Sequence, residues 1–572
     1  MEKKWLVKPG ISAQLIGKFP EINPLVLQLL SDRDIKTQKE IDQFLTPDYG
    51  EDQHDPFLFS DMEKAVKRIF EAIEKKQKIV IYGDYDADGV TATVVLYKTL
   101  DELGAKIDVY IPYRETEGYG LNIEAAKEII KADNKLVITV DCGISNVEEV
   151  KILQDGGVDV VITDHHHEPP ETPKAHAVIN HQIETEKYPF KSLSGVGVAF
   201  KLVQAIVISQ KKYLKNEKLN EGFEKWLLDL VSIGTVTDVV PLLGENRTLV
   251  KYGLVVLKKT QNIGLKKLVE VSKVQINDAD TYTIGFQIGP RINAAGRMDH
   301  ASTAYELLTT KSSKEAEKIA LELNQKNQER QKMTLKILEE AKNIIGAVGE
   351  QKIIIAVGKG WPTGLVGLVA GRLSDQYNRP VLIIADHTDE FVGSGRSIEQ
   401  FNIIEALDQC KKYLERYGGH KQACGFTIAN KKNLDEFIKE ITKLATKQLT
   451  KKDLQPVLSI DMEVDLEDIS WDLYNELAKF EPFGEGNPKP IFLARKVNIV
   501  DVGTVGKNGN HLKAMVSHNS NNLRKTIGFS FGDWCDKLKA GDKIDMVFEV
   551  DKNVWNHSQE LQLKIIDLKL SK

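Results

Sequence analysis

Cysteine is scarce in this sequence, and no two cysteines lie close together. The chain has 572 residues and only four cysteines, Cys142, Cys410, Cys424 and Cys535. None belongs to a C-x-x-C pair, so the spacing favours neither a zinc site nor a disulfide framework. We therefore expect a protein of a reducing compartment, the cytoplasm.

Long hydrophobic runs are also missing. No stretch of about eighteen apolar residues occurs, so we expect no helix that spans a membrane. The first ten residues, MEKKWLVKPG, lack the apolar segment of a signal peptide. These absences predict a cytosolic protein without a membrane partner.

An excess of one charge sign is the third feature that the sequence lacks. It holds 77 basic and 83 acidic side chains, for a net charge of −6. This balance excludes a globally basic protein that coats nucleic acid, but it leaves room for a local basic groove. The length is too great for one core and predicts three or four packed units.

The pattern of apolar residues changes along the chain. Residues 1 to about 70 are typical of helices with polar breaks. From residue 78, short Val- and Ile-rich segments alternate with helical ones: KIVIYGD, KIDVYIP, KLVITVD, VDVVITD and HAVIN. Such alternation predicts a parallel sheet with crossover helices, and the nearly continuous apolar runs fit strands buried on both faces.

Three further regions follow this sheet. A long amphipathic segment, about 314–345, begins at a capping box of Ser312 and Glu315 and fits either a connecting helix or an ordinary core helix. A second alternating region runs from 352 to about 445. From about residue 458 several short strands with polar turns predict a small barrel or sandwich.

The strongest chemical signal is the segment IVIYGDYDADGVTA, in which Asp84, Asp86 and Asp88 directly follow a strand. Three carboxylates this close repel one another, and burial at a strand end requires a compensating cation. Oxygen ligands of this kind suit Mg²⁺ or Mn²⁺. A calcium-binding EF-hand loop is the alternative, but the helix–loop–helix context and the Glu at loop position twelve are absent.

Two further predicted strands end in the same way. Asp141 follows one of them, and Asp164, His165 and His166 follow another. Because ligands gather at the carboxyl ends of strands in an open parallel sheet, we expect these side chains to converge. Imidazole beside carboxylates favours Mn²⁺ without excluding Mg²⁺. Asp238, an acid in an apolar stretch, is a weak candidate by itself.

These residues resemble the DHH phosphoesterase superfamily, and within it the RecJ exonucleases. The resemblance covers most of the chain and rests on an ordered set of segments. They are HDPFLFSDMEKAV, YGDYDADGVTA, VDCGIS, TDHHHEP, LSGVGVAFKL, GTVTDVVPL, GPRINAAGRMDHASTAYELL, GSGRS and YGGHKQACGFTI.

The resemblance implies a site with two divalent cations, Mn²⁺ or Mg²⁺. Asp86 and Asp88 would be ligands of separate metals, and Asp141 would bridge the two. His165 and Asp238 would complete the second site. Asp84 and His166 would lie beside the cluster, where they orient ligands and water.

The resemblance also implies an architecture of the α/β class. It comprises a parallel-sheet DHH catalytic domain, a long connecting helix, a second α/β DHH-associated domain and a C-terminal β-barrel (an OB-fold). The expected boundaries are an N-terminal helical segment packed on the catalytic domain (1–70), then 71–305, 306–348, 349–450 and 451–572.

The implied activity is 5′→3′ hydrolysis of single-stranded DNA to 5′-mononucleotides, in DNA repair and recombination. The polarity rests on the resemblance alone. We expect Arg291 or Arg297 to contact the scissile phosphate, and a structural salt bridge is the alternative for both. The protein is expected to be a monomer, with a helicase and a single-strand-binding protein as candidate partners.

An exonuclease must also recognise an end of the strand. We expect Arg114, Ser394 and Arg396 to hold the 5′-terminal phosphate. Gly418 and Gly419 would let the backbone approach the strand, with His420 on a phosphate or a base, although a plain turn fits the same residues.

The predicted barrel has a local excess of basic residues. Residues 491–530 hold Arg495, Lys496, Lys507, Lys513, Arg524 and Lys525 against Asp501 alone. This excess predicts a surface that follows a phosphate backbone and includes Lys513. The aromatic residues Phe529, Phe531 and Trp534 fit either base stacking or a core.

Two positions depart from the family pattern. A third histidine, His167, follows the usual pair; we expect it to be exposed, although it makes the alignment of the pair ambiguous. Pro362 stands where relatives often carry a polar side chain, which puts a role in gripping nucleic acid in doubt at that position.

Two other functions remain open. One is a DHH phosphodiesterase of short oligonucleotides or cyclic dinucleotides, which the strand-rich C-terminal region disfavours. The other is a catalytically inactive nucleic-acid or replication scaffold, which the complete set of acids and histidines disfavours.

Overall fold

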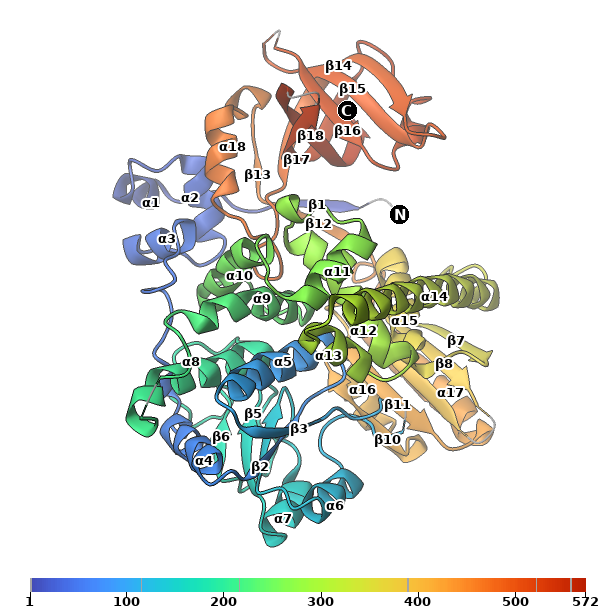
Figure 1. Cartoon of the computed structure of the whole chain (residues 1–572). Coiled ribbons are helices and arrows are strands. Elements are labelled where there is room, and N and C mark those ends of the chain that lie inside the picture. The colour runs from blue at the N-terminus through green and yellow to red at the C-terminus, as the bar shows by residue number, and fades with distance from the viewer. Residues whose placement is uncertain are drawn as a thin grey trace. The chain divides into compact units, whose positions relative to one another are not determined.

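The computed structural model describes residues 3–114, 116–215, 217–387, 390–520, 522–555 and 558–571. Its contacts divide the chain into two compact units (Figure 1). The first comprises residues 54–238 and 252–456, and the second comprises 3–53, 239–251 and 457–572.

The first unit begins with the predicted parallel sheet. Its strands are β2 (Lys78–Tyr82), β3 (Lys106–Tyr110), β4 (Leu136–Val140), β5 (Asp159–Thr163) and β6 (Ala177–Ile179). They lie in the order β3-β2-β4-β5-β6, and every pairing is parallel. All their carboxyl ends therefore lie along one edge.

Helices cover both faces of this sheet, as the apolar strands require. On one face, α6 (Ile123–Lys131) and α7 (Val147–Asp155) share a core with β2, β4 and β5. On the other lie α5 (Ala87–Glu102) and α8 (Gly195–Tyr213), which contact each other and the sheet (Figure 1). Further helices of this lobe are α4 (Met62–Glu74) and α9 (Leu228–Thr237).

A helical region leads from this lobe to the next sheet. It contains α10 (Gly244–Leu257), α11 (Ile263–Ser272), the π-helix η4 (Thr283–Ile288), α12 (Gly289–Met298), α13 (Ser302–Thr309) and α14 (Ser313–Ile345). The long predicted helix is α14. Ser312 caps it by accepting a hydrogen bond from the Glu315 amide. The reciprocal half of the predicted capping box is wrong, because the Glu315 carboxylate accepts from the Thr310 hydroxyl instead.

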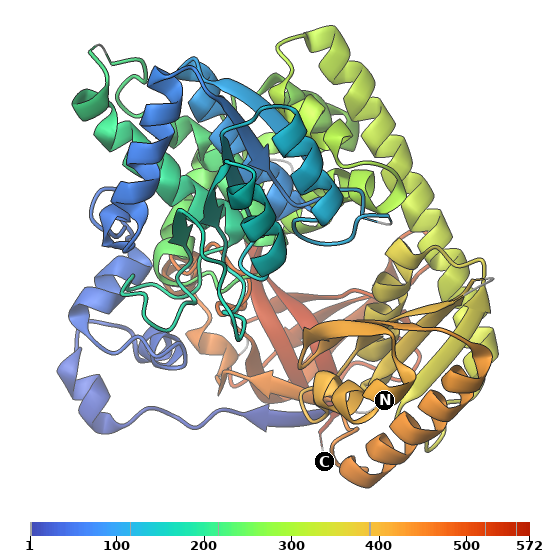
Figure 2. The same cartoon turned by 90° about the horizontal axis from the view of Figure 1, so that it is seen from below.

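The second sheet is mixed. Its strands are β7 (Ile354–Lys359), β8 (Val381–Asp386), β9 (Phe391–Arg396), β10 (Arg416–His420) and β11 (Ala423–Ile428), in the order β10-β11-β9-β8-β7. Only the β7–β8 pairing is parallel. One face packs on α14 and α15 (Thr363–Tyr377); the other packs on α16 (Ile403–Gln409) and α17 (Lys431–Gln448), which lies along the outside in Figure 2.

The second unit is built around a closed barrel. Its strands are β14 (Phe492–Val505), β15 (His511–Ser517), β16 (Arg524–Gly528), β17 (Lys543–Trp555) and β18 (Ser558–Leu570). Neighbours pair in the order β14-β15-β16-β18-β17, and a β14–β17 pairing closes the ring. The open choice between barrel and sandwich is thus decided in favour of a barrel. Smaller elements beside it are β1 (Lys4–Val7), β12 (Val457–Ile460), β13 (Met462–Glu463) and α18 (Trp471–Ala478).

The N-terminal segment does not pack where we expected. Its helices are α1 (Ala13–Lys18), α2 (Pro24–Ser31) and α3 (Gln38–Leu45). Residues such as Leu27 and Phe44 share one hydrophobic core with Phe492 and Phe548 of the barrel. The expected packing of residues 1–70 on the catalytic domain is therefore wrong for residues 3–53, whose apolar faces are buried within the second unit.

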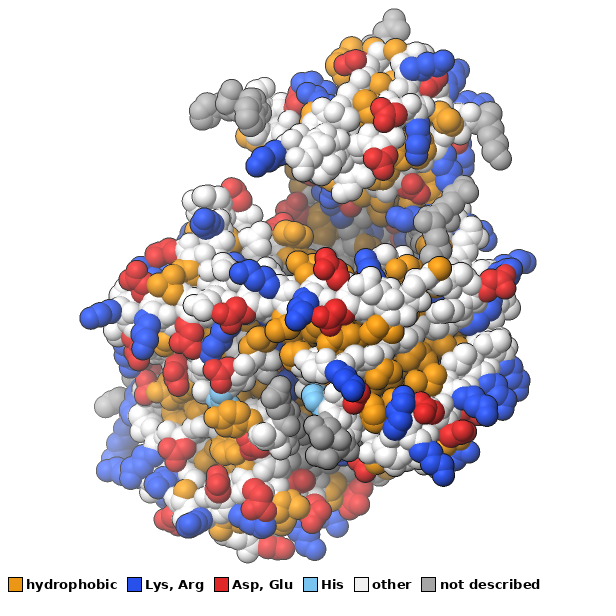
Figure 3. All heavy atoms as spheres, turned by 90° about the vertical axis from the view of Figure 1, so that its right-hand side faces the viewer, with side chains coloured by type: hydrophobic (Ala, Val, Ile, Leu, Met, Phe, Trp, Pro, Cys, Tyr) orange, Lys and Arg blue, Asp and Glu red, His pale blue; other side chains and the backbone are white. Residues whose placement is uncertain are grey.

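The surface carries no uniform charge on the face that Figure 3 shows. Lys and Arg side chains are interspersed there with Asp and Glu, as the net charge of −6 predicts. Over the part of the chain that is described, no helix is both long enough and apolar enough to cross a bilayer.

Candidate metal centre

The first acidic residues lie where β2 passes into α5. Asp86 is the N-cap of α5, and its Oδ1 accepts from the amides of Asp88 (2.9 Å) and Gly89 (3.1 Å). Gly89 is required here, because a Cβ at this position would lie 2.7 Å from the backbone oxygen of Asp84. The local turn therefore brings the three carboxylates together at the edge of the sheet.

The first turn of α8 binds Asp88 and lies against one further carboxylate, that of Asp141. Asp88 accepts from the amides of Gly195 (2.6 Å) and Val196 (3.0 Å), at the positive end of the helix dipole. A Cβ on Gly195 would lie 2.3 Å from Oδ1 of Asp141. The absence of a side chain at Gly195 thus lets Asp88 and Asp141 approach the same helix terminus.

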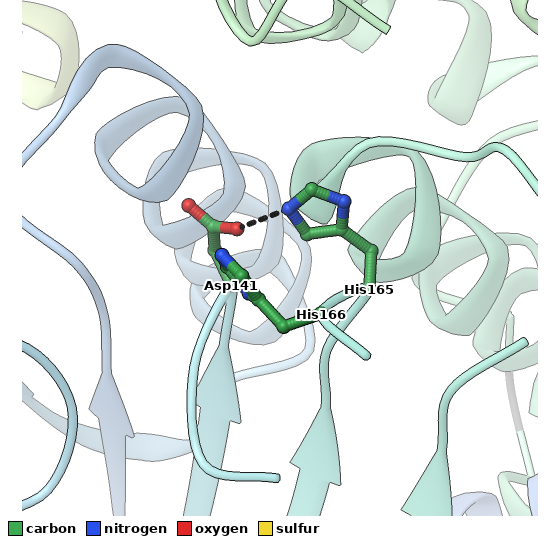
Figure 4. Close-up of side chains that lie close together, drawn as sticks. All are labelled: Asp141, His165 and His166. Carbon is green, nitrogen blue, oxygen red and sulfur yellow. Dashed lines mark ion pairs between the residues drawn. The ribbon is translucent and has the colours of Figure 1, made fainter. Parts of the chain in front are cut away.

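Asp141 and the histidines come from the next two strands, as predicted. Asp141 directly follows β4 in a left-handed conformation (φ +61°), which is uncommon for a residue with a side chain. His165 and His166 follow β5, and Figure 4 shows His165 pointing at Asp141. Nε2 of His165 lies 3.1 Å from Oδ1 of Asp141 and 3.6 Å from Oδ2 of Asp238, which caps α9.

The donor atoms form overlapping sets suited to cations. One set is Asp84, Asp86 and Asp141; a second is Asp88, His165 and Asp238; and a third joins Asp141 to both histidines. Within each set the donor atoms lie within 4.8 Å of one another. Since Asp141 belongs to two sets and contacts the remaining one through His165, the arrangement fits two adjacent cations with Asp141 between them.

Four buried atoms of this cluster lack any hydrogen-bond partner among the described residues: Asp84 Oδ1, Asp141 Oδ1, His165 Nε2 and Asp238 Oδ2. A buried polar atom without a partner costs free energy, so a cluster of them indicates a missing ligand. These oxygen and imidazole donors suit Mn²⁺ or Mg²⁺. The residues present therefore fit the expected metals.

The electrostatics of the metal-free cluster are unfavourable. Burial and neighbouring carboxylates raise the pKa of Asp84 and Asp141 well above the ordinary value. The same causes raise the pKa of Asp238 well above that value and the pKa of Asp88 to about 7. Burial and the charge of His166 lower the pKa of His165 to about 3, so its imidazole is neutral and able to ligate.

Asp164 hydrogen-bonds the backbone and the His166 ring next to the donor sets, a role that the sequence did not predict. Its carboxylate accepts from the amides of Ile144 (2.9 Å), His165 (2.7 Å) and His166 (3.1 Å), and from Nδ1 of His166 (2.8 Å). Burial would raise its pKa, but these bonds and the imidazole charges outweigh burial and lower it. Asp164 in turn raises the pKa of His166 against the opposing effect of burial.

The predicted arginines form part of a larger positive cluster. Arg297 donates to the Gly364 carbonyl (3.0 Å), and burial and the charges of Arg114 and Arg330 lower its pKa to about 10. Arg291 donates to Asn324 Oδ1 (3.0 Å). Within the described residues neither pairs with a carboxylate, so the salt-bridge alternative is wrong for both. Arg330, whose pKa is lowered by burial and by the charges of Arg372 and Arg291, also belongs to this cluster and gave no signal in the sequence.

The expected 5′-phosphate residues lie close to this cluster. Arg114 stacks over the Tyr85 ring (4.9 Å), and Arg396 donates to the Ser394 hydroxyl (3.3 Å) on the same strand, β9. Gly367 of α15 makes room for them, since its Cβ would lie 3.0 Å from the Ser394 hydroxyl and 3.4 Å from Arg396. The charge of Arg114 lowers the pKa of Arg396 after the larger effect of burial.

The segment with Gly418, Gly419 and His420 is an exposed edge strand, β10. Nothing would contact a Cβ at Gly418, which leaves its backbone open to a ligand. Gly419 has φ +141°, and a Cβ there would lie 2.2 Å from the Ala423 carbonyl oxygen of β11, so this position requires glycine. The His420 ring contacts that of His167 (5.9 Å), and His167 is exposed as expected, so His165 and His166 are the pair at the cluster.

The basic excess of the barrel is smaller than the sequence indicates. Arg495 pairs with Glu463 (3.0 Å) and Asp545 (3.3 Å), and Lys525 pairs with Glu560 (2.6 Å). Those acids lie outside the 491–530 window. Among the aromatic candidates, Phe531 and Trp534 pack against the core, whereas Phe529 is 53% exposed. Lys513 is exposed on β15 and free to contact a phosphate.

Comparisons with known proteins match every part of this arrangement. Family models match residues 78–235 (DHH family, N-terminal domain), 350–447 (DHHA1 domain) and 460–567 (RecJ OB domain). The single-stranded-DNA-specific exonuclease RecJ of Bacillus subtilis is 40% identical over 96% of this chain and 68% of its own length. That of Haemophilus influenzae is 32% identical, over 96% of this chain and 97% of its own length.

The chain belongs to the RecJ family.

Solved structures of RecJ proteins agree with this assignment. RecJ from Thermus thermophilus, crystallised in complex with Mn²⁺, superposes with a TM-score of 0.82 at 27% identity, over 100% of this chain and 80% of that one. The same RecJ in complex with Mg²⁺ gives a TM-score of 0.77. The α/β class, the DHH and DHHA1 domains and the OB-fold that the sequence predicted are confirmed.

Proposed function

We propose that this chain is a metal-dependent exonuclease that hydrolyses single-stranded DNA from the 5′ end to 5′-mononucleotides. One observation carries the proposal: Asp141 lies between the donors Asp84 and Asp86 and the donor set of Asp88, His165 and Asp238, beside a cluster of arginines. The first arrangement suits two divalent cations, and the second suits phosphates. The RecJ relatives, named as single-stranded-DNA-specific exonucleases, support the substrate.

The cluster would hold two divalent cations, Mn²⁺ or Mg²⁺. Asp84 and Asp86 would bind one cation, Asp88, His165 and Asp238 would bind the other, and Asp141 would bind both. When bound, such a pair lowers the pKa of water and neutralises charge on the phosphate. Asp84 is proposed here as a metal ligand, whereas the resemblance places it beside the cluster.

The remaining residues would orient the substrate. His166, whose pKa Asp164 raises against the effect of burial, would contact a phosphate oxygen. Arg297, which forms no ion pair with a described carboxylate and lies within electrostatic range of Asp86, would contact the scissile phosphate. Arg291 would contact the strand farther along.

The 5′ end would be held by Arg114, Ser394 and Arg396. Burial and the charge of Arg114 lower the pKa of Arg396, an anion between the two guanidinium groups would relieve their repulsion, and the Ser394 hydroxyl adds a donor. We expect Arg396→Ala to reduce cleavage of 5′-phosphorylated strands more than that of 5′-hydroxyl strands. An equal rate for wild type and variant on both ends would contradict this pocket.

The first experiment is a time course on two single-stranded oligonucleotides, one labelled at each end, with Mn²⁺ or Mg²⁺. The 5′ label is expected to appear at once as mononucleotide, while the 3′-labelled strand shortens progressively. Asp141→Ala is expected to be inactive, because both cations lose a ligand. Survival of long strands with cleavage of dinucleotides would favour a short-substrate phosphodiesterase, and a metal-free, inactive protein that binds strands would favour a scaffold.

Three other features that the sequence analysis expects are proposed as well. They are a monomeric state, a helicase and a single-strand-binding protein as partners, and a cytoplasmic location. Lys513 and the β10 residues Gly418, Gly419 and His420 are proposed as additional contacts to the strand. We propose the expected domain boundaries as well, except that residues 3–53 join the barrel.

A further inference from the structure

Two large aromatic side chains remain exposed near the metal centre. Tyr282 and Phe286 are 59% and 68% exposed, although rings of this size are stabilised by burial. They stack on each other, with ring centroids 4.7 Å apart and 25° between the planes. A stacked pair that stays in water indicates a binding surface.

The backbone that carries the pair is unusual. Tyr282 directly precedes the π-helix η4, and Phe286 lies within it. Such helices are rare and occur frequently at functional sites. The two residues are four positions apart, a spacing that places side chains on one face of a helix.

The pair is attached to the metal centre through α9. A Cβ on Gly285 would lie 3.8 Å from Val236, and a Cβ on Gly289 would lie 2.2 Å from Thr237. The π-helix therefore packs closely on the last turn of α9, which ends at the donor residue Asp238. A strand bound at the donor sets can continue over the two rings.

The charge beside the pair identifies the kind of ligand. Arg291 donates to the Gln287 carbonyl, the residue after Phe286, and has no carboxylate partner in the described part of the chain. An apolar peptide, or a second copy of this surface, would leave that positive charge uncompensated. Single-stranded DNA offers a flat base for the rings and a phosphate for the guanidinium.

We propose that Tyr282 and Phe286 form a stacking platform for a nucleobase of the single strand whose end lies at the metal centre. The inference rests on the proposed function, because it requires single-stranded DNA at this site. Every base has a flat face, so the platform accepts any sequence.

The test is a scan with abasic sites, read as binding in EDTA. A labelled 20-nucleotide strand is made with one abasic site, which is moved one position at a time. For wild type we expect one position at which the missing base raises Kd about tenfold. Phe286→Ala is expected to raise Kd about tenfold on the intact strand, with no further loss at that one position.

Two variants make the result specific. Phe286→Trp is expected to restore both the affinity and the sensitivity to the abasic site, since it restores a stacking surface. Trp226→Ala is the matched control: Trp226 is 48% exposed in a short helix (Phe223–Leu227) that lies directly before α9, at the end opposite Asp238. It is expected to bind every strand as wild type does.

Three outcomes would overturn the platform. The first is an unchanged Kd for Phe286→Ala. The second is a loss of affinity from Phe286→Ala that adds to the loss from the abasic site at every position. The third is a sedimentation coefficient of Phe286→Ala that differs from wild type while its DNA binding is unchanged, which would assign the pair to contact between copies. Failure of the proposed function is distinguishable, because it would appear as intact strands after incubation of wild type with Mn²⁺.

Discussion

At the scale of single residues, Asp164 connects the backbone to both histidines. Its two oxygens accept from three amides and one imidazole nitrogen, and it is fully buried. It donates no atom to the metal sets, yet the orientation of His165 and His166 depends on it. Groups that orient metal ligands in this way affect metal affinity strongly.

We predict that Asp164→Asn raises the Mn²⁺ concentration for half-maximal activity by about 10- to 100-fold. An amide accepts fewer of these bonds and removes the charge that raises the His166 pKa against burial. Asp159→Asn is the control, since Asp159 lies at the start of the same strand and pairs with Arg68 (2.6 Å). Equal metal titrations for both variants would show that Asp164 has no such role.

The carboxylate cluster also predicts a pH dependence for stabilisation by metal. Asp84, Asp88, Asp141 and Asp238 have raised pKa values, about 7 for Asp88, so their protonated forms favour the metal-free fold. That contribution is present at low pH and is lost as the pH rises through the raised values. The lowered pKa of His165 has the opposite effect on stability. It favours the fold above the ordinary value of 6.5, and that contribution is lost as the pH falls toward the folded value of about 3.

We therefore predict that Mn²⁺ raises Tm more at pH 8 than at pH 6, because cations relieve a repulsion that is greater at pH 8. Tm is measured with Mn²⁺ and with EDTA at each pH. Subtracting the EDTA value from the Mn²⁺ value at the same pH removes the pH dependence of groups outside the metal centre. Asp238→Asn is expected to reduce it. A Mn²⁺ effect that is larger at pH 6 would refute the assignment.

At the scale of elements, the first turn of α8 organises the centre. Its amides bind Asp88, and the missing side chain of Gly195 admits Asp141. The helix terminus thus supplies both charge stabilisation and space. Gly195, which has no side chain, therefore determines where the ligands Asp88 and Asp141 lie.

We predict that Gly195→Ala reduces exonuclease activity at least about 100-fold, since its methyl group would displace Asp141 and so disturb both cations. Gly197→Ala, on the same turn, is the control, because its Cβ would lie no closer than 3.3 Å to any neighbour. Activity and Mn²⁺ binding are measured for both. Similar losses in the two variants would mean that helix stability, rather than the position of Asp141, is responsible.

At the scale of the whole molecule, the second unit is assembled from three separate segments. Arg247, from the middle segment, is buried and donates to the carbonyls of Phe44, Lys479, Phe480 and Glu481. Deleting the barrel by truncation near Leu449 would therefore also uncover the core of residues 3–53.

We predict that Arg247→Ala destabilises the second unit by about 3 kcal/mol, because several buried carbonyls lose their donor at once. The loss should appear as an earlier transition in thermal unfolding. Cleavage of dinucleotides, if it occurs, should persist below that transition. A transition unchanged from wild type would show that water replaces the guanidinium without cost.

Much of the catalytic half follows from the sequence alone. Strands buried on both faces give continuous apolar runs, and parallel strands share a carboxyl edge, so residues that follow the strands had to meet. The parallel sheet and the grouping of Asp84, Asp86, Asp88, Asp141 and His165 were predicted on this basis, and the long helix was predicted from its amphipathic pattern. The family resemblance added Asp238, which its surroundings in the sequence did not single out.

Only the tertiary structure decided features that depend on partners distant in sequence. The acids that pair with Arg495 and Lys525 lie outside the basic window, so local composition overstated its charge. The N-terminal helices have an apolar face, but a pattern of period 3.6 does not state which core will bury it. In the sequence, Asp164 cannot be told apart from the acids that bind metal, and only the hydrogen bonds show that its carboxylate faces backbone amides. Periodicity fixes the elements, whereas packing selects their partners.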